Sequence, residues 1–160
     1  MSGIIIALHC EARHEEALSA VMRTVPTTAD HSRDGIRATA AAVRLLNELA
    51  LACMQRGTPS FSFEAAFQYL RRAQKLPTSA ALKAVTLNNL SIYYSRTKQH
   101  YAALRCLQRV LKQEQAATGM HPRSDCDDVS VHVSLNLTTV LADLGRHRDA
   151  LAMAQQDACS

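Results

Sequence analysis

The sequence has no tryptophan, and phenylalanine and tyrosine together supply only 4% of its 160 residues. Glycine and proline are also rare, with 5 and 4 residues. These two residues are the poorest helix formers, whereas alanine, which is abundant here, is the best. The composition therefore predicts helices packed against helices. Because 48% of the residues are hydrophobic, the composition also excludes a wholly disordered chain.

No apolar run reaches the ~20 residues that a membrane-spanning helix requires. The most apolar segment, residues 3–8, has no basic segment before it and is followed closely by Glu11, unlike a signal peptide. We therefore interpret residues 4–8 as a buried helix. We expect a soluble protein of the cytoplasm, including its cytoskeleton.

The five cysteines form no Cys-x-x-Cys motif and are odd in number, so the sequence predicts neither a disulfide framework nor a zinc ribbon. Cys53 and Cys106 lie in helical patterns and are expected to be small buried side chains in a reducing compartment. His9, Cys10 and His14 form the nearest group of metal-ligand types, but their spacing does not suit one helix face. With no glycine-rich phosphate loop either, we expect no metal, no cofactor and no enzymatic activity.

The formal net charge of +4 is small, and the basic residues are scattered along the chain. The only adjacent basic pair is Arg71-Arg72. Nucleic-acid-binding proteins usually gather lysine and arginine on one face or along one helix. The charge pattern therefore argues against nucleic acid as the main partner.

Helical periodicity extends over nearly the whole chain. Asp34 is a candidate N-cap, and Gly57, Gly119 and Gly145 mark the ends of helical stretches. The first four predicted helices cover residues 4–8, 14–25, 36–56 and 61–75. A fifth runs from Ser79 to a turn at 96–99, and a sixth runs from that turn to Gly119. A seventh runs from the acidic cluster 125–128 to Gly145, and an eighth follows Gly145. We predict a single domain of residues 1–160, in which residues 26–34 form a loop or hinge.

A set of residue types recurs along the chain. Leu90 is followed by a small residue at the next position, an aromatic residue at four, an alanine at thirteen and a leucine at seventeen; these are Ser91, Tyr94, Ala103 and Leu107. The same offsets from Leu137 give Thr138, Leu141, Ala150 and Ala154. From Leu49 they give Ala50 and Cys53 and, after four extra loop residues, Ala66 and Leu70. Residues 13–18 match the turn and second helix of this pattern.

This pattern resembles the tetratricopeptide repeat, a helix-turn-helix unit. The repeats are spaced by 41 (90 − 49) and 47 (137 − 90) residues, whereas the usual period is ~34. The segments 87–90 (Leu-Asn-Asn-Leu) and 119–122 (Gly-Met-His-Pro) resemble the long-period repeats of kinesin light chains. The resemblance implies a right-handed superhelix of three to four antiparallel hairpins. It also implies an adaptor, a scaffold or a structural subunit of a larger assembly, which binds other proteins rather than small molecules.

In such a superhelix, the first helix of each hairpin lines a concave groove. Asparagine amides there can hydrogen-bond the backbone of a partner peptide or helix, and Arg44 and Arg96 can meet its acidic groups. The predicted groove residues are Arg44, Asn47, Leu51, Asn88, Asn89, Ile92, Arg96, His132, Asn136 and Thr139. One alternative is that Asn88, Asn89 and Asn136 only link successive repeats. A second is a helical-repeat RNA-binding protein, which would need more basic residues on this face.

Overall fold

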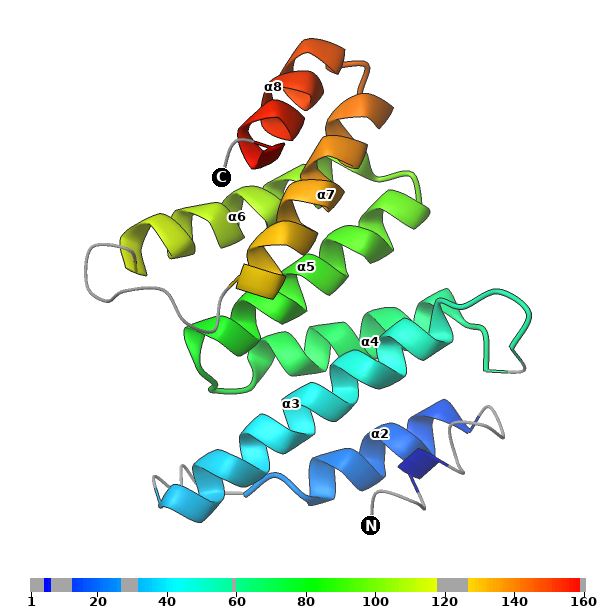
Figure 1. The fold of residues 1–160 in the computed structure, drawn as a ribbon. Helices are drawn as coiled ribbons and strands as arrows, with labels where there is room; N and C mark the ends of the chain where they lie inside the picture. The colour runs from blue at the N-terminus through cyan, green and yellow to red at the C-terminus, as the bar shows by residue number, and fades with distance from the viewer. Residues whose placement is uncertain (1–4, 7–12, 27–31, 59, 118–126, 159–160) are drawn as a thin grey trace. The chain divides into compact units, whose positions relative to one another are not determined.

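The computed structural model describes residues 5–6, 13–26, 32–58, 60–117 and 127–158. Within these ranges the chain forms seven helices, labelled α2 to α8, and no strand, which confirms the all-α class (Figure 1). The helices are α2 (His14–Arg23), α3 (Arg33–Cys53), α4 (Phe63–Lys75), α5 (Ala80–Arg96), α6 (His100–Ala117), α7 (Asp127–Asp143) and α8 (His147–Ala158). Of the predicted first helix, residues 5 and 6 are helical, and the others lie outside the described residues.

Serine side chains cap the starts of three helices. The hydroxyl oxygen of Ser32 accepts a hydrogen bond from the amide of Gly35 at 3.1 Å, and that of Ser62 accepts from Ala65 at 3.1 Å. Ser79 plays the same part at the start of α5. The predicted cap Asp34 was wrong, because α3 begins at Arg33 and Asp34 lies in its first turn. Of the predicted hinge 26–34, residues 27–31 lie outside the described part, while residues 33 and 34 belong to α3.

The sequence predicts one domain, and the contacts group residues into two compact units, Met1–Thr86 and Leu87–Ser160. The boundary falls inside α5, between Thr86 and Leu87. The first seven residues of α5 therefore belong to the first unit, and the remainder belongs to the second.

In the first unit, α3 packs against α4, and α2 contacts both of them. The core includes Val43, Leu46 and Ala50 of α3 together with Ala66 and Leu70 of α4, all with essentially no exposed surface. Ile36 lies seven residues before Val43 and so on the same side of α3 by helical spacing, but it is exposed in the first turn of the helix.

In the second unit, α7 packs against both α6 and α8. Its core includes Leu90 of α5, Leu107 of α6, and Val133 and Leu137 of α7. Leu90 and Leu137 are two of the three residues from which the repeat pattern was counted, and both are buried, as is the third, Leu49.

The turns after α5 and α7 have the same hydrogen-bond geometry. Lys98 and Gly145 both adopt left-handed backbone conformations, with φ of 63° and 74°. In each turn the next residue's amide donates to the carbonyl five residues earlier, at 2.7 Å after Lys98 and 2.9 Å after Gly145. In each turn the left-handed residue also donates to the carbonyl three residues earlier. Both turns are therefore Schellman motifs, and they recur at the 47-residue spacing of the sequence pattern.

The turn between α3 and α4 is a longer version of the same closure. Gly57 is also left-handed, with φ of 86°. The amide of Ser62 donates to the carbonyl of Cys53, nine residues earlier, at 3.0 Å. This bond closes the turn as the five-residue bonds do after α5 and α7, but it spans four more residues. These closures place the three alanines of the pattern at matching buried positions in the second helices; they are Ala66, Ala103 and Ala150.

The start of α2 matches the start of α8. Arg13, just before α2, forms an ion pair with Glu16 in the first turn of that helix. Arg146, just before α8, forms one with Asp149 in the first turn of that helix. In both helices the amide four residues after the arginine donates to the arginine carbonyl at 3.0 Å. The short N-terminal segment thus has the local structure of a second helix of the repeat.

The left-handed turn residues generate a paired prediction. Lys98→Gly should raise the free energy of unfolding by about 0.5–1 kcal/mol, because glycine adopts this conformation without a steric cost. Gly145→Ala should lower the free energy of unfolding by about 1 kcal/mol, because alanine is strained in the left-handed conformation. A steric clash does not contribute, since a Cβ at this position would meet no atom within 4 Å. Urea denaturation followed by circular dichroism measures both changes. Equal stability of all three proteins would contradict the left-handed geometry.

Candidate functional site

The ten predicted groove residues divide by exposure. Five are exposed, namely Arg44, Leu51, Arg96, His132 and Thr139. Two are partly buried, namely Ile92 and Asn136, and three are buried, namely Asn47, Asn88 and Asn89. The structure brings Ile92, Arg96, Asn136 and Thr139 together around one cleft in the second unit. It does not bring the other six into that cleft.

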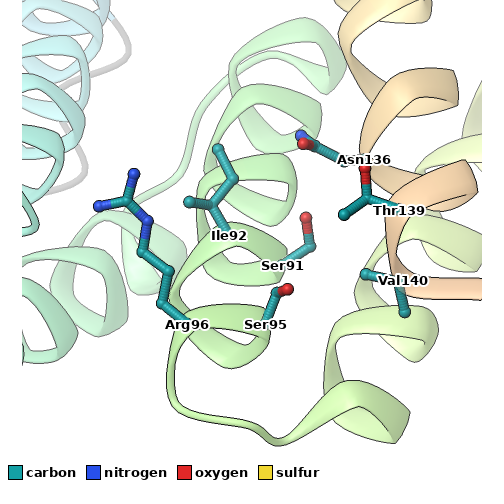
Figure 2. Close-up of a pocket in the computed structure, with 7 residues that line it drawn as sticks. All are labelled: Ser91, Ile92, Ser95, Arg96, Asn136, Thr139 and Val140. Carbon is teal, nitrogen blue, oxygen red and sulfur yellow. The ribbon is translucent and has the colours of Figure 1, made fainter. Parts of the chain in front are cut away.

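The cleft lies between α5 and α7 and has a volume of about 290 Å³ (Figure 2). Its lining consists of Ser91, Ile92, Ser95 and Arg96 from α5, and of Asn136, Thr139 and Val140 from α7. These residues are spaced by three or four positions along each helix, so each helix contributes one face to the cleft. In Figure 2 the guanidinium group of Arg96 extends away from the α7 side chains, at one edge of the cleft.

Small side chains on α5 leave room for this cleft. Ser91 and Ser95 lie one helical turn apart and point toward α7 in Figure 2. The hydroxyl of Ser91 donates to the carbonyl of Asn88 at 2.6 Å, so it does not require a partner from α7. The sequence analysis treated Ser91 only as a small packing residue. A second serine, Ser95, follows four residues later, and this helical spacing indicates that both serines lie on the same face of α5.

The buried asparagines link helices within each unit. The side-chain amide of Asn136 donates to the side-chain carbonyl of Asn88 at 2.8 Å, which joins α7 to α5. In the first unit, the amide of Asn47 donates to the hydroxyl of Thr86 at 3.0 Å and to the carbonyl of Val43 at 2.8 Å. Two of the three asparagines of the linking alternative, Asn88 and Asn136, therefore bond to each other, and Asn47, which that alternative did not include, forms a similar link.

The cleft offers hydrogen-bonding groups and aliphatic surface. The Thr139 hydroxyl donates to the carbonyl of Leu135 at 2.9 Å, and its lone pairs can still accept a hydrogen bond. Ile92 and Val140 supply aliphatic surface beside these polar groups. Beyond the cleft, the Nδ1 atom of His100 lies 3.4 Å from a carboxylate oxygen of Asp143, which connects the start of α6 to the end of α7.

Sequence reasoning missed a cluster in the first unit, where His14 meets Cys53 and Tyr69. The Cys53 sulfur lies 3.9 Å from Nδ1 of His14, and the Tyr69 hydroxyl donates to the His14 carbonyl at 3.1 Å. Burial raises the pKa of the Cys53 thiol to about 12 and lowers the pKa of His14. Both side chains are therefore neutral at pH 7, which fits packing among α2, α3 and α4. His9 and Cys10, considered with His14 above, lie outside the described residues.

No family model, curated protein or solved structure matches the chain. In the described ranges, no group of three or more His, Cys, Asp or Glu side chains is placed to hold a metal ion. Across that same part of the chain, none of the helices combines the length and the apolar character needed to cross a membrane.

The asparagine pair yields a stability prediction. Asn136→Ala should lower the free energy of unfolding by about 1–3 kcal/mol, because it leaves the buried carbonyl of Asn88 without its partner. The double variant Asn88→Ala with Asn136→Ala should lose less than the sum of the two single variants. Gln155→Ala, at an exposed position of α8, is the control. Strictly additive losses in urea denaturation would show that the two side chains do not interact.

The buried thiol yields a labelling prediction. Iodoacetamide should modify Cys53 slowly in the folded protein at pH 8, because only the thiolate reacts and burial keeps the thiol protonated. Denaturant should accelerate the reaction by at least about 100-fold, as the pKa returns to its ordinary value near 8.5. Peptide mapping by mass spectrometry follows each cysteine separately. Rapid labelling of Cys53 without denaturant would mean that the core of the first unit opens readily.

Proposed function

We propose that this chain is a tetratricopeptide-like interaction module that holds a peptide or helix of another protein in the cleft between α5 and α7. In this proposal the hairpins stack in the right-handed superhelix of that family, and the protein acts as an adaptor or as a subunit of an assembly. The chain works by binding and not by catalysis, in a reducing cytoplasmic compartment.

The main support for the proposal is the identity of the two helices that form the cleft. Its two walls come from α5 and α7, which are equivalent helices 47 residues apart and precede equivalent Schellman turns. A site between equivalent first helices is what a repeat-built binding surface provides, since each repeat contributes one wall. The same residue positions would then form successive parts of a longer groove.

The lining indicates what kind of segment the cleft holds. A volume of about 290 Å³ accommodates one or two side chains with the adjoining backbone. Hydroxyl and amide groups of Ser95, Thr139 and Asn136 can satisfy the ligand's peptide groups, while the partly exposed Ile92 contacts an aliphatic side chain. Arg96 at the edge favours an acidic residue next to the aliphatic one.

RNA suits this cleft less well. Its lining contains one basic residue, Arg96, and no aromatic side chain on which a base could stack. Affinity for RNA comes mainly from neutralising phosphates with several lysine or arginine residues, and binding then falls steeply with salt. A protein ligand therefore fits the lining better.

The test is affinity capture from native cell extract at low and high salt, followed by mass spectrometry. The bait proteins are the wild type, Thr139→Trp, which fills the cleft from an exposed position, and Gln108→Trp, an exposed control on α6. We expect a defined set of proteins on the wild type and on Gln108→Trp, reduced at least about tenfold on Thr139→Trp, a loss of roughly 1.4 kcal/mol of binding free energy.

Equal recovery on all three baits would rule out the cleft as the binding site. Recovery dominated by RNA and removed by high salt would favour the RNA-binding alternative. Retention at both salt concentrations in fixed stoichiometry would identify a permanent assembly subunit rather than a transient adaptor.

A further inference from the structure

Within the second unit, α7 lies against both helices of the preceding hairpin. Asn136 of α7 bonds to Asn88 of α5, and Asp143 of α7 approaches His100 of α6. The side of α7 that faces the preceding hairpin carries Val133, Asn136 and Val140, at positions i, i+3 and i+7. The α5–α6 hairpin thus provides a seat for one further helix.

On the α7–α8 hairpin, apolar side chains are exposed at the equivalent positions. Val131, Leu135 and Leu151 expose 57%, 62% and 60% of their surface. The equivalents of Leu135 and Leu151 one repeat earlier, Asn88 and Leu104, expose only 7% and 8%. The last described hairpin thus has exposed leucines at two positions that are buried in the preceding hairpin. Exposed leucine and valine side chains on one face mark an interaction surface rather than an ordinary solvated one.

The charge of this hairpin differs from that of the rest of the chain. Residues 127–158 contain five aspartates and two arginines, a formal charge of −3, whereas the whole chain carries +4. Helix α7 itself contains three aspartates and no lysine or arginine. An apolar face on an acidic hairpin is complementary to an apolar helix flanked by basic residues.

We propose that the exposed face formed by Val131, Leu135 and Leu151 seats a basic amphipathic α-helix of a partner protein. That helix occupies the position that α7 occupies on the preceding hairpin. This surface shares no residue with the cleft between α5 and α7, so it is a second binding site and goes beyond the proposed function.

The repeat also indicates the residue pattern of the seated helix. It presents apolar residues at i and i+7, as α7 does with Val133 and Val140. At i+3, where Asn136 bonds to Asn88, the facing residue is now Leu135, so the seated helix presents an apolar residue there as well. Lysine or arginine on its flanks complements the net negative charge of residues 127–158.

A second copy of this chain is a poorer occupant. Pairing through α7 would bring together two helices that each carry three aspartates and no basic residue. Like charges set against each other across an interface oppose association. The side of α7 that fits a helical seat is also already buried within its own unit, as Val133 and Val140 show.

The test uses the full chain and a synthetic probe. The probe is a fluorescein-labelled 18-residue peptide of leucine and lysine, with leucine at helical spacing i, i+3, i+4 and i+7. Two control peptides have the same composition in scrambled order, or glutamate in place of lysine. Fluorescence anisotropy should show saturable binding of the probe, at least about tenfold tighter than either control, and weaker at high salt.

Variants locate the binding surface. Leu135→Glu and Leu151→Glu should each weaken probe binding at least about tenfold. Ile36→Glu, at a side chain of α3 that is 61% exposed, should leave binding unchanged. Circular dichroism establishes that each variant is folded, and Leu135→Ser replaces any glutamate variant that is not.

The outcomes are distinct. Failure of the probe to bind, or equal binding of the scrambled or acidic peptide, would overturn the proposal. So would retention of full affinity in both leucine variants. Dimerisation of the wild type in light-scattering chromatography that is abolished by Leu135→Glu would instead assign the face to a second copy, and it would also overturn the proposal.

Discussion

Each described hairpin turn depends on how the chain leaves its first helix. A left-handed residue reverses the backbone, and an amide then bonds back to a carbonyl near the end of that helix. This closure sets where the second helix begins, and it thereby aligns the buried alanines Ala66, Ala103 and Ala150. Lys98 performs this role despite its side chain, which shows that the hydrogen-bonded geometry is kept even where the residue type is unfavourable.

Close contact between helices depends on small residues, and specificity depends on a few buried amides. A buried alanine lies in the second helix of each described hairpin, while Asn47 and Asn88 bond to helices that follow in the chain. An unpaired buried amide is costly, so each asparagine favours one pairing of helices over other apolar arrangements. The cleft arises beside these bonds, where Ser91 and Ser95 leave space between α5 and α7.

Much of the fold could be predicted because local signals agree. Helical periodicity and glycine turns indicated helices, and residue types recurring at fixed offsets indicated equivalent hairpins. Exposure could not be predicted in the same way. Ile36 lies on an apolar stripe and yet is exposed, and Asn47 and Asn88 look like groove residues but bond within the chain. A periodic pattern identifies one face of a helix, but the neighbouring helix decides whether that face is covered.

Helix α5 belongs to both compact units, because the boundary between Thr86 and Leu87 divides it. The backbone hydrogen bonds of α5 cross that boundary, so turns of the helix that pack in one unit are hydrogen-bonded to turns that pack in the other. Neither unit can open completely without disturbing a helix that the other requires. If one unit unfolds, the α5 turns that stay packed in the other end at this boundary, and the hydrogen bonds that cross it are lost.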